Sequence, residues 1–252
     1  MIDIQPVLFG DNYNFFVHSG GPDFAVIDLS NGAALTRELK SRKITPTHLF
    51  LTHHHFDHID GITDFVKTFP KIQVYKPKGE DRIPVAGIEV DNEVQLTFGD
   101  IQVRVLTTHA HTKHCAAYLF DETDFFVGDA LFQGGCGRLF EGSVYDLEEA
   151  MDLFLSLSPE TKLYFGHEYG LTNLRFARHL EPTNQQVHKA LQKLEALQDH
   201  EECALPVFLE EELQTNPFLR VDEPELCNIL DPDAQLQRHE RLYQLRIRRD
   251  HF

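Results

Sequence analysis

Thr52-His53-His54-His55-Phe56-Asp57-His58 follows an apolar run at residues 47–51 and precedes apolar residues at helical spacing over 59–69. His53 and His55 are two positions apart, so on an extended chain they point the same way. Asp57 and His58 follow where the chain turns into the helix. Because such a loop can aim four donor atoms into one small volume, it predicts a site for zinc, iron or manganese. A chance run of surface histidines is the alternative, which the fixed offsets behind the strand disfavour.

Three more candidate ligands stand at the ends of later strand-like runs. His111, Asp129 and His167 each follow such a run, and a glycine directly precedes the last two. A glycine there permits close approach of the backbone. Three ligands for each of two ions, plus one carboxylate able to bridge them, are the inventory of a binuclear site. The predicted ligands are His53, His55 and His111 for one ion, Asp57, His58 and His167 for the other, and Asp129 for both.

The pattern His-x-His-x-Asp-His at residues 53–58, with the later His, Asp and His, resembles the metallo-β-lactamase superfamily. Four further segments narrow the resemblance to glyoxalase II, the hydroxyacylglutathione hydrolases. They reach from the middle of the chain to its last residue and are Gly-Gly-Cys-Gly-Arg-Leu-Phe-Glu-Gly at 134–142, Gly-His-Glu-Tyr at 166–169, Asn-Pro-Phe-Leu-Arg at 216–220, and Arg-Ile-Arg-Arg-Asp-His-Phe at 246–252.

The chain departs from that family at two places. Residues 109–114 read His-Ala-His-Thr-Lys-His where the family has Pro-Gly-His-Thr-x-Gly-His, and Asp-Leu-Ser at 28–30 replaces Asp-Pro-Gly. The ligand role goes to His111 because it keeps the position before the threonine. Neither departure removes a ligand. Three nearby histidines are expected beside the site without binding metal: His54, His109 and His114.

The resemblance implies an α/β protein with an αββα metallo-β-lactamase-like sandwich at residues 1–166 and a C-terminal helical substrate-binding domain at 167–252. It implies two divalent metal ions, with zinc as first choice and iron or manganese as alternatives. The implied reaction is hydrolysis of S-(2-hydroxyacyl)glutathione, above all S-lactoylglutathione, by a metal-bridging hydroxide in the second step of methylglyoxal detoxification. The implied catalytic residues are Asp57 and Asp129, and the implied substrate-binding residues are Arg138, Phe140, Tyr169, Arg246 and Arg249.

The chemistry of the predicted site favours a thioester over an amide. A thiolate, whose parent pKa is about 8.5, leaves without prior protonation, whereas an amine needs a proton donor. The arginines near the C-terminus have an alternative explanation as cations at a solvated helix end. That explanation is kept for Arg241 and Arg248. Arg246 and Arg249 are three positions apart and share a helix face, so the resemblance assigns them to the glycine carboxylate of glutathione.

Length and composition agree with a globular enzyme. The chain of 252 residues is 42% hydrophobic and 25% charged, enough for a sizeable core. Its net charge of −17 argues against a nucleic-acid substrate, because phosphate backbones bind basic surfaces. No apolar run is long enough to span a bilayer, the first residues resemble no signal peptide, and the four cysteines lack metal-binding spacing. These features favour a cytoplasmic protein without a nucleic-acid or membrane partner. The resemblance implies a small glutathione thioester as the partner, and we expect a monomer.

Secondary structure changes character near residue 167. Before it, short strand patterns dominate, and helices are predicted at 33–42, 59–69 and 144–157, the last with Ser143 and Asp146 at capping-box spacing. After it, amphipathic helices are predicted at 171–180, 187–197 and 236–247, with Asp231-Pro232 as an N-cap followed by proline.

Two other functions compete with thioester hydrolysis. The same superfamily contains glutathione-persulfide dioxygenases, which use one iron and consume oxygen; the helical C-terminal region and the full second ligand set disfavour that reading. A non-catalytic binding module on a retired hydrolase scaffold is the other alternative, and the intact ligands disfavour it.

Overall fold

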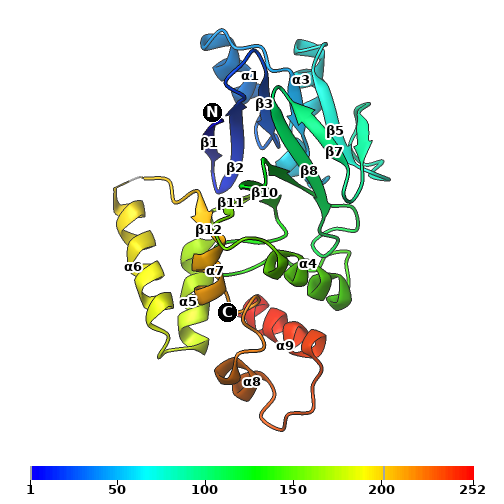
Figure 1. Cartoon of the computed structure of the whole chain (residues 1–252). Helices are drawn as coiled ribbons and strands as arrows, with labels where there is room; N and C mark the ends of the chain where they lie inside the picture. Colours follow the sequence, from blue (N-terminus) through cyan, green and yellow to red (C-terminus); the bar gives the residue numbers. More distant parts are fainter. Residues whose placement is uncertain (1, 201) are drawn as a thin grey trace. The chain divides into compact units, whose positions relative to one another are not determined.

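The computed structural model describes residues 2–200 and 202–252 and divides into two compact units. Met1–Thr107 and His114–Gly128 form the first, called here the sheet unit. Thr108–Lys113 and Asp129–Phe252 form the second, called the helical unit (Figure 1). The chain therefore enters the helical unit twice. The sequence division at residues 166 and 167 stays a prediction.

The first sheet lies within the sheet unit and has six strands in sequence order. They are β1 (Asp3–Phe9), β2 (Asn12–His18), β3 (Phe24–Ile27), β4 (His48–Phe50), β5 (Gln73–Pro77) and β6 (Ile88–Val90). The first three strands pair antiparallel, and those from β3 to β6 pair parallel. Parallel neighbours need crossovers, and helices supply two of them: α1 (Gly32–Ser41), then α2 (Phe56–Ile59) with α3 (Ile62–Thr68). The histidine-rich stretch is the start of the crossover after β4.

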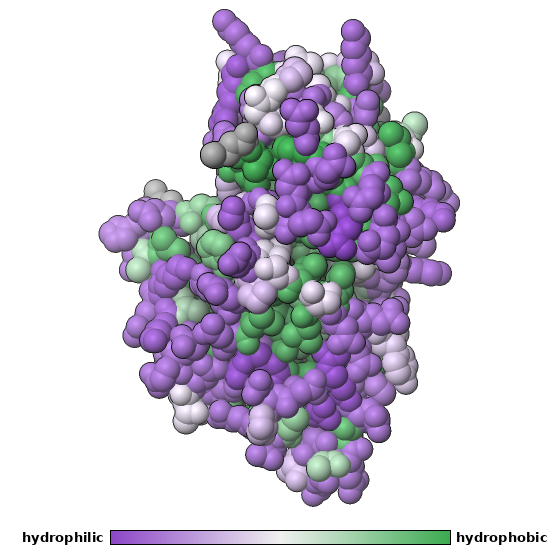
Figure 2. Space-filling view, viewed as in Figure 1, coloured by the Kyte–Doolittle hydropathy of each residue, from purple (hydrophilic) through white to green (hydrophobic). Residues whose placement is uncertain are grey.

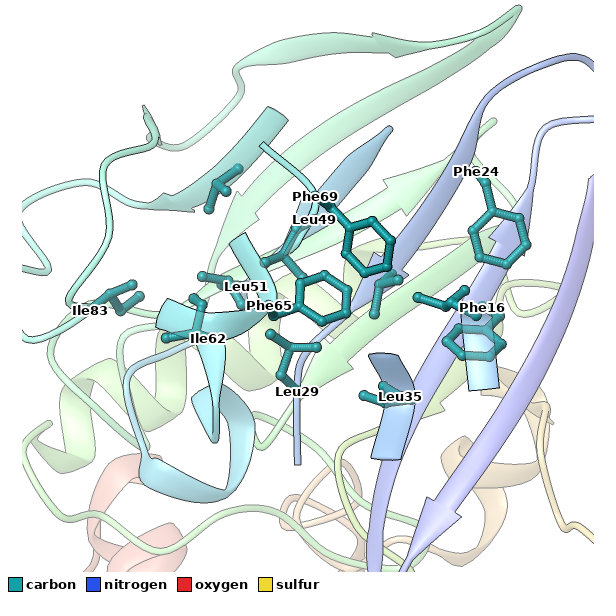
Figure 3. Packing of buried hydrophobic residues seen from close by; sticks show 13 residues of the cluster. Phe16, Phe24, Leu29, Leu35, Leu49, Leu51, Ile62, Phe65, Phe69 and Ile83 are labelled. Carbon is teal, nitrogen blue, oxygen red and sulfur yellow. The ribbon is translucent and has the colours of Figure 1, made fainter. Parts of the chain in front are cut away.

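Apolar faces of α1 and α3 cover this sheet (Figure 3). Leu35 of α1 and Phe65 of α3 join a buried cluster with Phe16 and Leu49 of the strands. Spacings of three and four residues bring such side chains to one helix face, and the strand residues of the cluster come from one face of the sheet. The apolar residues at helical spacing after residue 58 therefore supply the face of α3 that packs on the sheet.

The continuous helix predicted over 59–69 is wrong. The structure has two short helices separated at Asp60 and Gly61, where Gly61 adopts φ +72°. The carbonyl of Asp60 accepts a hydrogen bond of 2.9 Å from the backbone N–H of Gly32 at the start of α1. A Cβ on Gly61 would lie 3.3 Å from the Cα of Gly32. The break is thus set by close packing of two glycines far apart in sequence.

Four antiparallel strands of the second sheet complete the sheet unit. They are β7 (Gln95–Phe98), β8 (Ile101–Thr107), β9 (Ala116–Phe120) and β10 (Asp124–Gly128). Aromatic rings fill the space between the two sheets. Phe15 of β2 lies 5.2 Å from Phe126 of β10, and Phe50 of β4 lies 5.5 Å from Phe120 of β9, measured between ring centroids. The sheets therefore form a sandwich with the α1 and α3 layer outside one face.

The helical unit contains one short strand pair and six helices among the described residues. Its elements are α4 (Val144–Ser156), β11 (Lys162–Phe165), α5 (Gly170–Leu180), α6 (Gln185–Asp199), β12 (Val207–Phe208), α7 (Leu209–Thr215), α8 (Pro224–Leu230) and α9 (Arg238–Asp250). Helix α6 contacts both α5 and α7, and helix α9 contacts both α4 and α8 (Figure 1). Leu174 packs with Leu191 and Leu194 between α5 and α6.

Helix ends were predicted with mixed success. The capping box of Ser143 and Asp146 is present at α4. The N-cap at Asp231 is wrong, because this residue ends α8 and its carboxylate accepts hydrogen bonds from the backbone N–H groups of Gln235 and Leu236. Helix α9 begins later, with a capping box of Gln237 and Glu240. The short elements β6, β12, α7 and α8 went unpredicted, since they contain too few residues to show a period.

Polar residues dominate the visible surface. Hydrophilic residues cover most of the face drawn in Figure 2, in keeping with the net charge of −17. Within residues 2–200 and 202–252, no helix combines the length and apolar character that crossing a membrane requires.

Candidate metal centre

The sheet unit presents its donors in the loop that follows β4. His53 and His58 are both 1% exposed, and His53 Nε2 lies 3.0 Å from His55 Nδ1. Asp57 and His58 lie in the first turn of α2. All four residues belong to groups of His and Asp side chains that can hold a metal ion. The loop at the end of a buried parallel strand therefore carries all four candidate donors of this motif.

Asp28 orients two of these histidines. Its carboxylate accepts hydrogen bonds from the Thr52 backbone N–H (2.8 Å), the Thr52 hydroxyl (2.7 Å) and the Nδ1–H of His58 (2.8 Å). Because the Thr52 hydroxyl hydrogen is used there, its oxygen accepts from the Nδ1–H of His53 at 3.0 Å. Both imidazoles are thereby left with an unprotonated Nε2, the form that binds a metal ion.

Two other contacts brace the same loop. The Asn12 amide donates to the carbonyl and to Oδ2 of Asp57, both at 3.1 Å. His54 Nδ1 lies 3.2 Å from the buried carboxylate of Glu80. Burial acts to raise the pKa of Glu80, but hydrogen bonds from Arg82 and the charges of His54 and Arg82 together outweigh it and lower that pKa, so the carboxylate stays charged beside His54. His54 thus lies beside Glu80, whereas His53 and His55 lie beside each other.

Asp28→Asn is expected to weaken zinc binding by about 10–100-fold. The amide NH2 would face the Nδ1–H of His58, which would favour the tautomer protonated at Nε2 and so block that ligand. Retention of zinc against a competing chelator measures the effect. Asp64→Asn, at an exposed position, is the control for the lost charge. Unchanged zinc retention in Asp28→Asn would contradict the orienting role.

The helical unit presents three candidate donors, of which two imidazoles converge on one carboxylate. Asp129 Oδ2 lies 3.4 Å from His111 Nε2 and 3.4 Å from His167 Nε2. His111 donates its Nδ1–H to the carbonyl of Arg138 at 2.9 Å, which leaves its Nε2 unprotonated and able to bind a metal ion. All three residues are buried and belong to metal-competent groups of side chains. In the helical unit, imidazole nitrogens that face a carboxylate oxygen fit a divalent ion such as zinc, iron or manganese.

Two glycines permit the close approaches that the donors need. Gly128, just before Asp129, has φ +53°, and a Cβ there would lie 2.7 Å from Thr52 Oγ1. Gly137 passes so close to the donors that a Cβ would lie 2.1 Å from the Asp129 carbonyl and 2.8 Å from His111 Nδ1. The close approach expected of the glycine before Asp129 is therefore present.

Three predicted substrate-binding arginines gather around Asp250. The Asp250 carboxylate lies 3.1 Å from Arg246 and 3.2 Å from Arg138. Arg246 is 5% exposed and donates to the Cys136 carbonyl at 2.7 Å, whereas Arg249 donates to the Asn173 side chain at 2.9 Å. Burial, then the charges of Arg246 and Arg138, lower the pKa of Arg249. Three cations against one carboxylate make a locally positive site on an acidic chain.

Two predicted substrate-binding aromatic residues pack against predicted ligand histidines of the same unit. Phe140 is 61% exposed, and its ring meets that of His111 edge-on at 5.3 Å. Tyr169 is 36% exposed and stacks on His167 at 4.6 Å between ring centroids. Exposed rings beside the donors are suited to contact a bound ligand.

Sequence reasoning assigned no role to several residues that brace the site. Only two signals were available, the Asp-Leu-Ser turn at 28–30 and the Asn-Pro-Phe-Leu-Arg segment, and neither reveals a hydrogen-bond partner. The residues missed are Asn12, Asp28, Thr52, Glu80, Asn173, Glu212 and Asn216.

The fold and the donor set define a metal-binding hydrolase scaffold. Residues 12–167 match the family model of the metallo-beta-lactamase superfamily, and the chain belongs to that superfamily. Residues 168–252 match the model described as the hydroxyacylglutathione hydrolase C-terminus. The predicted fold class, a metallo-β-lactamase sandwich followed by a helical domain, is thereby confirmed.

Solved structures share this fold at low identity. ETHE1 from Myxococcus xanthus is 21% identical with a TM-score of 0.66, over 96% of this chain and 95% of that chain. TTHA1623 in a di-iron-bound form is 22% identical with a TM-score of 0.62, over 85% and 100%. A metallo-beta-lactamase from Staphylococcus aureus subsp. aureus COL is 18% identical with a TM-score of 0.66, over 99% and 72%. These likenesses concern the fold alone.

Proposed function

We propose that the protein hydrolyses S-(2-hydroxyacyl)glutathione, with S-lactoylglutathione as the main substrate, to glutathione and a 2-hydroxy acid. One observation carries the proposal. The loop at residues 132–138, called here the glycine loop, touches metal donors and an arginine cluster together: Gly137 lies against His111 and Asp129, while the Cys136 carbonyl accepts from Arg246. A substrate with an electrophilic carbonyl near one end and a carboxylate at the other matches that pairing.

The proposed metal ligands are those predicted from the sequence: His53, His55 and His111 for one ion, Asp57, His58 and His167 for the other, and Asp129 for both. Bound there, two divalent ions would polarise the thioester carbonyl and lower the pKa of a coordinated water toward about 7. Asp28 and Thr52 keep the protons of His58 and His53 on Nδ1, away from the metal side.

The other residues act on the glutathione half of the substrate. The cluster of Arg138, Arg246 and Arg249 supplies charge and planar donors for the glycine carboxylate. Phe140 and Tyr169 offer exposed rings to the peptide part. No general acid is required, because a thiolate leaves without prior protonation. An anion site combined with a ligand-rich centre supports this proposed substrate class.

Arg246→Ala with Arg249→Ala is expected to raise KM for glutathione thioesters by about 10–100-fold, since a hydrogen bond to a charged group contributes about 1.5–3 kcal/mol. Hydrolysis of small thioesters without glutathione, and the metal content, should stay near wild type. Thiol release measured for both substrate types checks this. Arg248→Ala, on the same helix, is the control, and Arg249→Ala alone is the milder variant because Arg246 is the buried member.

Equal damage to small thioesters would show that the arginines are not a glutathione site. Metal analysis and an oxygen electrode separate the main alternative: one iron per chain with oxygen uptake on glutathione persulfide would support the dioxygenase reading. A metal-loaded protein inert towards every thioester and persulfide would support a non-catalytic binding module. That the protein is a cytoplasmic monomer stays a prediction.

A further inference from the structure

Glu212 is a buried acid that the proposed reaction does not use. It lies in α7, is 1% exposed, and its Oε2 accepts hydrogen bonds from the Gly134 backbone N–H (2.8 Å) and the Asn216 side chain (2.9 Å). Its Oε1 has no hydrogen-bond partner among the described residues. Burial raises the pKa of Glu212 to about 8 despite these two hydrogen bonds, so the side chain is neutral at neutral pH.

Glu212 and Asn216 together hold the glycine loop from one side. The Asn216 amide also donates to the carbonyl of Gly135 at 3.0 Å and that of Phe132 at 3.3 Å. Phe132 and Gly135 in turn exchange two backbone hydrogen bonds that close the turn. Helix α7 and the residue that ends it thus fix three backbone groups of this loop.

The glycine loop also contacts the proposed metal donors and the proposed substrate-binding residues. The Phe132 ring meets that of His167 edge-on at 5.8 Å and that of Tyr169 at 5.1 Å. Five residues further on, Gly137 fits against the Asp129 carbonyl and the His111 ring with no room for a side chain. Between them, the Cys136 carbonyl accepts the hydrogen bond of Arg246. A shift of this loop would therefore move all three metal donors of the helical unit.

We infer that Glu212 is a positioning residue: through the glycine loop it sets the metal donors of the helical unit and the arginine that binds the substrate carboxylate. The inference rests on the proposed metal ligands and the proposed glutathione site. It differs from a general packing role, because the affected quantities are metal affinity and KM and not the stability of the fold alone.

Three variants test the role in the full-length protein. Glu212→Ala leaves the Gly134 N–H without its buried acceptor and removes one of the three acceptors of the Asn216 amide. Glu212→Gln keeps the shape, the neutral state and one oxygen acceptor. Glu211→Ala is the matched control, since the neighbouring side chain pairs with Lys193 at 3.0 Å and does not touch the loop. Each zinc-loaded protein is titrated with a chelator, melted, and assayed for kcat and KM on a glutathione thioester and a small thioester.

We expect Glu212→Ala to hold zinc about 10–100-fold more weakly, as for other residues that orient metal ligands. KM for the glutathione thioester should rise by about tenfold or more, because misplacement of a binding group by about 1 Å is costly. Glu212→Gln should restore both quantities to within about threefold of wild type, since the loop keeps an acceptor. Glu211→Ala should match wild type throughout.

A Glu212→Ala protein that melts lower yet holds zinc and substrate like Glu211→Ala would overturn the positioning role. So would a Glu212→Gln protein as impaired as the alanine variant. If Glu212→Ala does not fold, Glu212→Asp replaces it, because its shorter side chain withdraws the carboxyl from Gly134; wild-type zinc retention there would equally overturn the role. A wild-type protein that binds no metal ion or cleaves no thioester would instead refute the proposed function.

Discussion

Asp129→Asn is expected to lower kcat/KM for S-lactoylglutathione by about 10³-fold, because several kcal/mol of charge stabilisation would be lost and each ~1.4 kcal/mol is tenfold. Asp129 Oδ2 is the oxygen on which His111 and His167 converge, each at 3.4 Å. An amide has no negative charge and a single acceptor oxygen, so it cannot balance two cations. Thiol release gives the rate, and elemental analysis should find fewer than two ions per chain.

Asp121→Asn controls for the loss of one carboxylate. This residue lies in the turn after β9, where its side chain accepts from the Gln102 backbone N–H, and an asparagine oxygen can do the same. We expect full metal content and an unchanged rate. An Asp129→Asn protein with two ions and wild-type turnover would contradict the bridging role of Asp129 and with it the binuclear proposal.

Gly137→Ala is expected to be the most damaging methyl addition in the helical unit. The new Cβ would lie 2.1 Å from the Asp129 carbonyl oxygen, which belongs to the backbone and cannot swing aside like a flexible side chain. Overpacking of this kind costs about 1–3 kcal/mol, and a shift of about 1 Å at a functional group can cost about 10²-fold in rate. The melting temperature, zinc retention and thiol release should therefore all fall.

Gly21→Ala is the matched control, because its added Cβ would lie 3.6 Å from Ser19 Oγ, an ordinary contact. This variant should melt, bind zinc and turn over like wild type. If Gly137→Ala also kept wild-type zinc retention and rate, the glycine loop would have to be free to move away from the donors. That outcome would also count against the proposed route from Glu212 to the metal centre.

The sequence alone could predict what depends on neighbouring residues. Helical spacing located the long helices, and short strand patterns were readable before residue 167, because each element buries one face and leaves a periodic signature. The capping box of Ser143 and Asp146 was readable for the same reason, since both partners lie within one turn. The family followed from the short motif at residues 53–58 and four later segments, which are local patterns too.

Contacts between distant segments decided what local patterns could not. The helical pattern is broken at Gly61, the N-cap of α3, where Gly32 lies against it, and nothing within residues 59–69 indicates that neighbour. Asp231 followed by proline has the local signature of a helix start, yet its carboxylate accepts from the two backbone groups of a turn that precedes α9. Local preference was overridden in both cases by a specific partner.

The candidate site divides along the same line. Its candidate donors can be named from the sequence, because metal ligands are few residue types at recognisable spacings. Their orientation is not, because it depends on hydrogen bonds across the fold: Asp28 reaches Thr52 over 24 positions, Glu212 reaches Gly134 over 78, and Asn216 reaches Phe132 over 84. Such partners leave no periodic trace, so only the tertiary structure decided which buried polar groups hold the donors in place.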